Sequence, residues 1–259
     1  MVDLDLHGAN ILLRLPNNID DLTSDHLYEK YGQPTLEEVE QVDGRPLDHW
    51  VPDNGVVPIW LGGRGDKLSL ADSHIFLSDF GKSFQPGSYV RRSSHMPLVL
   101  RPPEILLDPA SQFSFPAEIW SLACAVFRIM GQRPLSSEWF LSKDQVLQYQ
   151  VDALGQLPQE LWLRWANRSH YSDDQLRSVT GLEHRSLEDL LDKSIQEPRN
   201  KKNMVVMDEE EKQSFTKLMK LMLSLRPDDR PSAQQVLESH WVQGWAIPTM
   251  GLIDDGLVH

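Results

Sequence analysis

The chain has 259 residues, of which 40% are hydrophobic and 24% are charged, an ordinary composition for a globular domain with a sizeable core. Its formal net charge of −13 argues against broad nucleic-acid binding, which needs basic patches. No run approaches the ~18–20 apolar residues of a membrane helix. The start carries Asp3 and Asp5 where a signal peptide has a basic region. We therefore expect neither a nucleic-acid partner nor a membrane partner.

The single cysteine, Cys124, excludes an internal disulfide. It lies in an apolar run with helical spacing, so we expect a buried structural thiol rather than a reactive one. These features are typical of an intracellular protein, located in the cytoplasm, the nucleus or both.

The first part of the chain reads as a loop that runs into a short strand and is followed by a long insert. Residues 1–15 contain Asp-Leu-His-Gly-Ala-Asn and then the apolar run Ile-Leu-Leu. Residues 16–55, the start of this insert, are acidic and irregular, and we expect them at the surface, with only a weakly helical stretch at 36–39. The glycine-rich residues 61–66 lack the Gly-Lys-Ser/Thr ending of a phosphate-binding loop, which favours a plain turn.

The second part of the chain is mainly helical, after a strand predicted at 75–78. Ser232 predicts the cap of a final helix through Val242, and the tail 243–259 has no clear periodicity, so we expect it to lie loosely on the surface. The predicted fold class is mainly α with a small β-hairpin. Apolar residues at helical spacing predict three further helices, the first of them buried on most sides, at 116–130, 143–154 and 208–225.

Two carboxylates and an amide have the spacing that a phosphotransferase needs. Asp5 and Asn10 lie five positions apart in the first loop, and Asp79 follows the predicted strand at 75–78. The first Asp can accept a proton from an attacking hydroxyl. The Asn and the second Asp supply oxygen ligands, which Mg²⁺ prefers. The pattern predicts phosphoryl transfer from a nucleotide, on condition that the three residues meet in the fold.

Four landmarks follow one another in the order found in protein kinases. Residues 79–81 are Asp-Phe-Gly, and Arg-Pro-Pro-Glu at 101–104 resembles the Ala-Pro-Glu that closes an activation segment. Glu-Ile-Trp-Ser-Leu at 118–122 looks like the start of the central helix of the large lobe. Residues 226–233 are similar to the segment whose second Arg pairs with that Glu. The sequence therefore resembles the C-terminal lobe of eukaryotic Ser/Thr protein kinases, which implies ATP and Mg²⁺ as cofactors.

The resemblance narrows to fungal proteins similar to the SR-protein kinases. Arg101 precedes Pro-Pro-Glu as it does in that group, and residues 56–61 and 154–158 look like sequences of its fungal members. In that family an insert separates the catalytic loop from Asp-Phe-Gly, and here Asn10 and Asp79 are 69 positions apart. The resemblance implies phosphorylation of Ser or Thr in proteins, with Arg/Ser-rich splicing factors as candidate substrates. An acidic chain would suit such basic substrates.

The same resemblance implies the residues of the active site. Asp5 would be the catalytic base, and His7, Asn10 and Asp79 would contact the nucleotide, with Asn10 and Asp79 also holding the metal. Two departures from the family pattern bear on this site. His7 stands where a Lys usually reaches the transferred phosphate, and Asp3 stands where a His usually braces the loop.

Other residues would support the site or the substrate. Glu104 and Arg230 would form a buried ion pair that ties the activation segment to the lobe, and Glu118 and Trp120 would belong to the buried central helix. Leu98, Val99 and Arg101 would shape the pocket for the residue that follows the phosphorylated one. The activation segment also holds candidate phosphate acceptors, which are Ser88, Tyr89, Ser93 and Ser94.

No sequence upstream of Asp5 corresponds to the N-terminal lobe of a kinase. We expect residues 1–242 to form a C-terminal lobe, with the insert at about 16–70 and a tail at 243–259, and we expect weak or no activity from this chain alone. Two alternatives stay open. One is a non-catalytic interaction module; the other is a small-molecule phosphotransferase of the aminoglycoside or choline kinase type, which carries a similar Asp-Leu-His-x-x-Asn.

Overall fold

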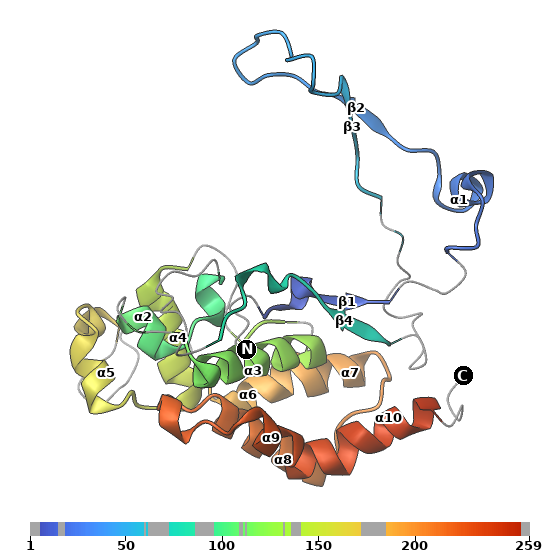
Figure 1. Ribbon diagram of the computed structural model, residues 1–259. Helices are drawn as coiled ribbons and strands as arrows, with labels where there is room; N and C mark the ends of the chain where they lie inside the picture. Colours follow the sequence, from blue (N-terminus) through green and yellow to red (C-terminus); the bar gives the residue numbers. More distant parts are fainter. Residues whose placement is uncertain are drawn as a thin grey trace. The chain divides into compact units, whose positions relative to one another are not determined.

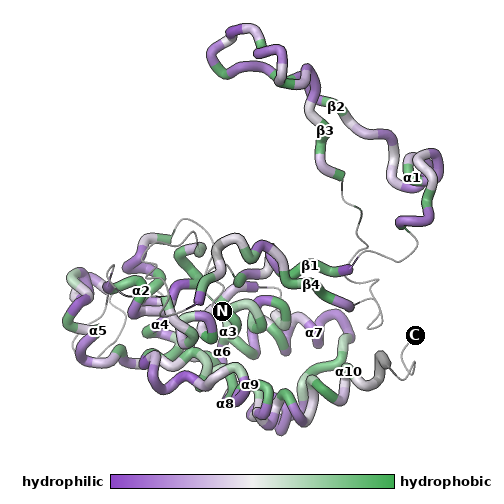
Figure 2. The backbone as a smooth tube through the Cα atoms, viewed as in Figure 1, coloured by the Kyte–Doolittle hydropathy of each residue, from purple (hydrophilic) through white to green (hydrophobic). Residues whose placement is uncertain are grey.

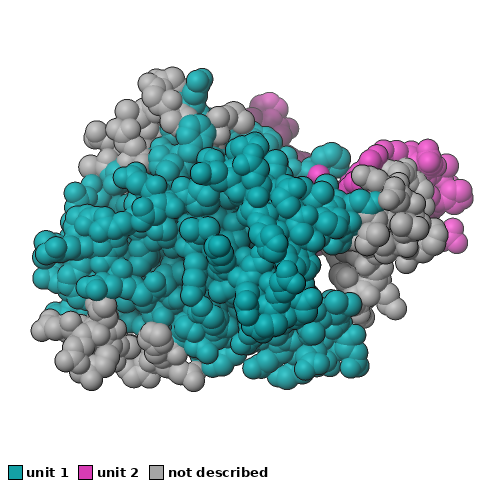
Figure 3. All heavy atoms as spheres, turned by 90° about the horizontal axis from the view of Figure 1, so that it is seen from below, with its two compact units in different colours: residues 1–12, 76–255 teal, residues 13–75, 256–259 magenta. Residues whose placement is uncertain are grey.

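The computed structural model describes residues 6–14, 19–59, 61, 73–85, 96–108, 111, 113–131, 133–135, 141–171 and 185–254. The chain divides into two compact units, which Figure 3 shows in different colours. Unit 1 comprises residues 1–12 and 76–255, and unit 2 comprises residues 13–75 and 256–259. Asp3, Asp5 and the four candidate phosphate acceptors at 88–94 lie outside the described residues, as does most of the glycine-rich stretch.

Unit 1 is built around α3 (Phe115–Gly131), which runs through its middle in Figure 1. Trp120, Ala123 and Phe127 on this helix are all at most 1% exposed, because apolar residues surround most of its circumference. The helix predicted at 116–130 is therefore confirmed within one residue at each end. Cys124 is also buried, as expected for a structural thiol.

Two features of the sequence fix α4 (Lys143–Leu154), whose predicted bounds are confirmed. Ser142 accepts a hydrogen bond from the backbone of Gln145, and the Gln145 side chain accepts one from the backbone of Ser142, which is a reciprocal capping box. At the other end, Gly155 adopts φ 93°, a conformation that favours glycine and ends the helix. The short helix α2 (Pro103–Leu107) packs against both α4 and α5 (Gln159–Arg164).

The remaining helices of unit 1 follow along the chain, and α8 packs directly on α3. Asp208 caps α8 through the backbone N–H of Glu211, which agrees with the amphipathic helix predicted there. Their bounds are α6 (Leu187–Leu191), the π-helical η7 (Asp192–Gln196), α7 (Glu197–Lys201), α8 (Glu209–Met222), α9 (Ala233–Leu237), the π-helical η9 (Val242–Ala246) and α10 (Ile247–Asp254).

The prediction for the end of the last helix was wrong. Ser232 does cap a helix, but α9 ends at Leu237 rather than at Val242. The tail is helical, as η9 and α10, although no periodicity predicted these elements. Most of residues 243–251 are exposed, in line with a surface position. The ring of Trp241 packs against that of Phe215 at 4.9 Å, a contact that the local sequence does not reveal.

Two short strands carry the segments on which the predicted metal ligands lie. β1 (Ile11–Leu13) pairs with β4 (Ile75–Leu77), and Figure 2 shows their hydrophobic residues in green. The backbone N–H of Ser78 donates to the carbonyl of Asn10 at 2.9 Å, and that of Arg14 donates to His74 at 2.8 Å. From residue 10 to residue 14 the hydrogen-bonded partner moves back from residue 78 to residue 74, so the two strands are antiparallel.

Unit 2 contains α1 (Ser24–Tyr31) and a hairpin of β2 (Leu36–Glu38) and β3 (Asn54–Val56). The helical expectation for 36–39 was therefore wrong, because pairing with a strand far along the chain overrides weak local propensity. The helix α1 was not predicted. Thr23 caps it through the backbone of His26, and Gly32 ends it with φ 91°.

Among the described residues, no helix has both the length and the apolar character needed to cross a membrane.

Gly131 lies where α3 meets η7, and a side chain there would be crowded. A Cβ atom at this position would sit 3.1 Å from the Ser194 carbonyl and 3.2 Å from Ile195. We predict that Gly131→Ala lowers the free energy of unfolding by about 1–3 kcal/mol through overpacking. Gly244→Ala is the matched control, because no atom lies within 4 Å of its Cβ position. Urea denaturation followed by circular dichroism tests this, and equal stabilities of the two variants would contradict it.

Candidate active site

The first loop of unit 1 places His7 and Asn10 on one short 3₁₀ turn, η1 (Gly8–Asn10). His7 caps this turn, because its Nδ1 accepts a hydrogen bond from the backbone N–H of Ala9 at 3.1 Å. The backbone N–H of Asn10 donates to the His7 carbonyl at 2.9 Å. His7 therefore holds the backbone of the loop on which Asn10 lies.

A cation from α3 lies against the same loop. A Cβ atom at Gly8 would be 3.7 Å from both Cδ and Nε of Arg128, so the Arg128 side chain passes beside the loop. Sequence reasoning missed this residue. The only local signal was a basic residue in the last turn of α3, which is common at helix C-termini for reasons of the helix dipole.

Asn10 and Asp79 are brought together by the Asn10 carbonyl. It accepts two hydrogen bonds from Ser78, one from the backbone N–H at 2.9 Å and one from Oγ at 3.2 Å. Asp79 is the next residue along the chain, so the two predicted metal ligands lie side by side although 69 positions separate them. The third predicted group, Asp5, lies outside the described residues.

Asp79 adopts an uncommon backbone conformation. Its φ of 60° and ψ of 49° lie in the left-handed region, and it precedes η4 (Phe80–Lys82) without capping it through its side chain. Such a conformation costs on the order of 1–3 kcal/mol for a residue other than glycine, and it is concentrated at functional sites. Within the described part of the chain, the Asp79 carboxylate has no hydrogen-bond or ion-pair partner. It is exposed and available to a ligand.

The donor chemistry of this pair fits Mg²⁺ better than a softer metal. Asn10 and Asp79 offer an amide oxygen and a carboxylate, and Mg²⁺ is often bound by one or two such groups together with substrate phosphates. No group of three or more His, Cys, Asp or Glu side chains that could hold a metal occurs among the described residues. A cation at this pair would therefore depend on the nucleotide for further ligands.

Arg230 and Glu104 form a bidentate ion pair in the core of unit 1. Two guanidinium nitrogens donate to the two Glu104 oxygens at 2.7 and 2.8 Å. The same guanidinium donates to the carbonyls of Pro116 at 3.0 Å and Ser224 at 2.8 Å. The Arg230 side chain is 0% exposed, and its Cζ lies 5.0 Å from the ring centroid of Trp120. This pair joins α2, the start of α3 and the segment after α8.

Glu118 and Trp120 both lie near the start of α3, but they differ in surroundings. Glu118 is half-buried in the first turn of the helix, and its backbone N–H donates to Ser114. Trp120 is 1% exposed beneath Arg230, and its indole N–H has no hydrogen-bond partner among the described residues. Its contribution is thus packing and a cation–π contact rather than a hydrogen bond.

The residues predicted to face the substrate form the turn η5 (Leu98–Leu100) and its end. Leu98 and Val99 are half-buried in this turn. Arg101 Nε donates to the Met96 carbonyl at 2.9 Å, and the Arg101 carbonyl accepts from Gln150 on α4 at 2.8 Å. The bond between Arg101 and Gln150 anchors the end of this turn to α4.

Comparison with known proteins identifies the family. The family model for the protein kinase domain matches residues 68–242, about two thirds of the chain. The chain belongs to the protein kinase family. The match begins after the loop that carries His7 and Asn10, and it includes Asp79, Glu104 and Arg230.

Solved structures of kinases share the fold. A crystal structure of a kinase domain matches over 93% of this chain with a TM-score of 0.50 and 18% identity. The kinase chain described here spans 59% of the length of that structure. No curated protein matches the sequence significantly.

The single thiol of this kinase chain is held in its neutral form. Burial raises the pKa of Cys124 to about 12, because the thiolate would be desolvated, and the nearby positive charge of Arg230 opposes this only in part. Cys124 is therefore a packing residue and not a nucleophile.

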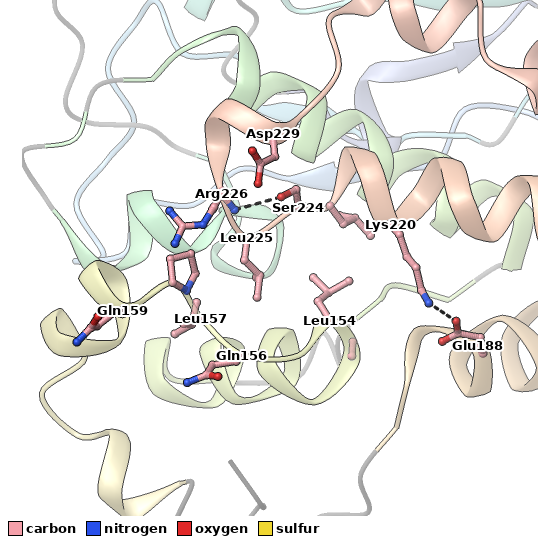
Figure 4. Close-up of a pocket in the computed structure, with 13 residues that line it drawn as sticks. Leu154, Gln156, Leu157, Gln159, Glu188, Lys220, Ser224, Leu225, Arg226 and Asp229 are labelled. Carbon is pink, nitrogen blue, oxygen red and sulfur yellow. Dashed lines mark hydrogen bonds and ion pairs between the residues drawn. The ribbon is translucent and has the colours of Figure 1, made fainter. Parts of the chain in front are cut away.

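A groove of about 670 Å³ opens on unit 1, away from the predicted site residues, none of which lines it. Figure 4 shows Leu154 and Leu225 inside it, with Lys220 and Glu188 pointing toward each other at one end. Arg226 at the other end pairs with Glu160 at 2.8 Å. Because its cations are paired with carboxylates, the groove offers little net charge to a ligand.

The burial of the Glu104–Arg230 pair predicts that two Glu→Gln substitutions differ greatly in their effect on the free energy of unfolding. Glu104→Gln leaves the Arg230 charge buried and without its counter-ion, which we expect to lower the free energy of unfolding by about 3–5 kcal/mol. Glu160→Gln removes the partner of Arg226, and both side chains of that pair are more than half exposed. This substitution should change the free energy of unfolding by less than about 1 kcal/mol. Urea denaturation of both variants measures the difference. Similar values would mean that the buried pair does not stabilise the lobe.

Proposed function

We propose that this chain supplies the large lobe of a Ser/Thr protein kinase related to the SR-protein kinases. The reaction is transfer of the terminal phosphate of ATP to a Ser or Thr hydroxyl of a basic, Arg/Ser-rich protein. We propose that residues 1–259 alone carry out this reaction weakly, because a kinase also needs a glycine-rich loop and a strand Lys to hold the nucleotide.

The pairing of Asn10 with Ser78 is the observation that carries this proposal. It brings the backbone of Asn10 next to that of Ser78, the residue before Asp79, although the insert separates the two segments in sequence. Asn10 and Asp79 would hold Mg²⁺, which in this reaction neutralises charge on the phosphates. Asp5 is proposed as the base that accepts the proton of the substrate hydroxyl.

The loop carries His7 where the family usually has a Lys, so we propose another source for the positive charge near the phosphates. His7, which caps the loop, is proposed to contact a phosphate oxygen of the nucleotide. Arg128, whose side chain passes beside Gly8, is proposed to supply the positive charge that the family normally places on a Lys. Leu98, Val99 and Arg101 are proposed to contact the substrate residue after the phosphorylated one.

The test is Mg²⁺-dependent ATP binding by the purified chain, followed by radiolabelled phosphate transfer to an Arg/Ser-rich peptide. We expect weak binding, and we expect Asp79→Asn to weaken it by more than about tenfold through loss of a metal ligand. Asp228→Asn is the matched control, since it removes one exposed carboxylate from η8 and should have no effect.

Three outcomes would contradict the proposal. Transfer to choline or an aminoglycoside instead of the peptide would support a small-molecule phosphotransferase. Absence of any Mg²⁺–ATP binding would support a non-catalytic interaction module. Equal binding by the wild-type chain and Asp79→Asn would remove Asp79 from the site.

A further inference from the structure

Residues 19–59, which make up most of the described part of unit 2, carry large apolar side chains but bury none of them. None of the residues 19–59 is buried. Leu36 is 59% exposed, Val56 65%, Trp50 66%, and Val42 is fully exposed. A two-stranded hairpin is marginally stable by itself, and it gains most from a further strand or a packed face.

The hairpin presents an apolar pair on one face. Leu36 is the register partner of Val56, and side chains directly opposite each other lie on the same face. Glu38 lies two residues after Leu36 and so projects to this same face. The face therefore combines an exposed apolar pair with a carboxylate.

The outer edge of β2 also has free backbone groups. The N–H of Val57 donates to Thr35 and that of Val39 to Asp53, both at 2.9 Å. In an antiparallel pair, residues whose backbone groups bond to the partner strand alternate with residues whose backbone groups point away from it. Because Thr35 and Val39 bond to the other strand, the N–H and C=O groups of Leu36 and Glu38 point away from β3. Among the described residues, no further strand pairs with this edge.

The charge around this edge is strongly negative. Residues 19–59 contain ten acidic and two basic residues, a net charge of −8, which is most of the −13 of the whole chain. Glu37, Glu38 and Glu40 lie on or next to β2. Acidic side chains often protect a free edge from pairing with another copy. Protection alone does not account for the exposed Leu36–Val56 pair on the adjoining face.

We propose that the outer edge of β2 binds an extended basic segment of another protein, in which Lys or Arg alternates with apolar residues. The partner strand would bond to the backbone of Leu36 and Glu38 and place its apolar side chains beside Leu36, whose register partner is Val56. Its cations would then lie on the opposite face, against Glu37. A second copy of this acidic unit is disfavoured by charge repulsion. The proposal concerns unit 2 and does not depend on phosphotransfer.

The experiment measures the fluorescence anisotropy of a labelled peptide of alternating Lys and Val residues, mixed with the full chain without nucleotide. We expect saturable binding that weakens with salt, because exposed charges are screened beyond about 8 Å at physiological ionic strength. Glu37→Gln should weaken binding by up to about fivefold, the effect of losing one cross-strand charge pair. Glu209→Gln on α8 is the control with the same change in net charge.

A second pair of variants tests the edge itself. Glu38→Pro removes an outward N–H of β2 and should abolish binding, whereas Asn54→Pro acts on the outer edge of β3 and should leave it intact. The amide signal of Gly55, opposite Glu37, reports whether each hairpin remains paired. The proposal would be overturned if the Gln variants of β2 and α8 lost peptide binding equally, or if the two Pro variants did. It would also be overturned if the chain formed concentration-dependent dimers through β2.

The proposals for the two units can fail separately. Peptide binding is measured in the Asp79→Asn chain as well, where it should be unchanged. If phosphotransfer is lost and peptide binding is retained, the proposal for the β2 edge still holds. If phosphotransfer is retained and the peptide does not bind, only the proposal for the β2 edge fails.

Discussion

The buried charge of Arg230 is the constraint on which the rest of unit 1 depends. A guanidinium that is 0% exposed must have its charge and its N–H groups satisfied within the protein. Glu104, 126 positions earlier, provides the counter-charge, and the carbonyls of Pro116 and Ser224 take further donors. The segments that carry Glu104, Pro116 and Ser224 are thereby fixed to one point, above the ring of Trp120.

The candidate active site is connected to this point through α3. The helix starts beside the ion pair at Pro116, and Arg128 near its other end lies against the loop that carries His7 and Asn10. The Asn10 carbonyl then holds Ser78, and Ser78 places Asp79. The position of the two proposed metal ligands thus follows from a series of packed and hydrogen-bonded contacts rather than from local sequence.

Much of the fold of unit 1 could be predicted because local signals and tertiary packing agree there. The bounds of α4 follow from its capping box and Gly155, and those of α3 from an apolar pattern that matches its burial. The Glu104–Arg230 contact could be anticipated only from motif resemblance, since spacing says nothing about two residues 126 positions apart. The left-handed conformation of Asp79 and the approach of Arg128 to Gly8 arise from tertiary contacts and have no sequence signature.

The failures occurred where long-range contacts decide local structure. β2 reads as weakly helical but pairs with β3. The helix α10 forms without an apolar period in its sequence. The acidic insert was described only as surface, whereas its hairpin exposes an ordered apolar pair. In both units, the features that bear on function are therefore the ones that periodicity alone does not predict.

The central claim is that Asn10 and Asp79 surround one divalent cation. The most direct measurement is paramagnetic broadening of amide NMR signals when Mn²⁺ and a nucleotide are added to the isotope-labelled chain. The account predicts that the signals of Asn10, Asp79 and Gly81 broaden together, while that of Gly244 keeps its intensity. Broadening confined to one of the two segments, or centred on another part of the molecule, would contradict it.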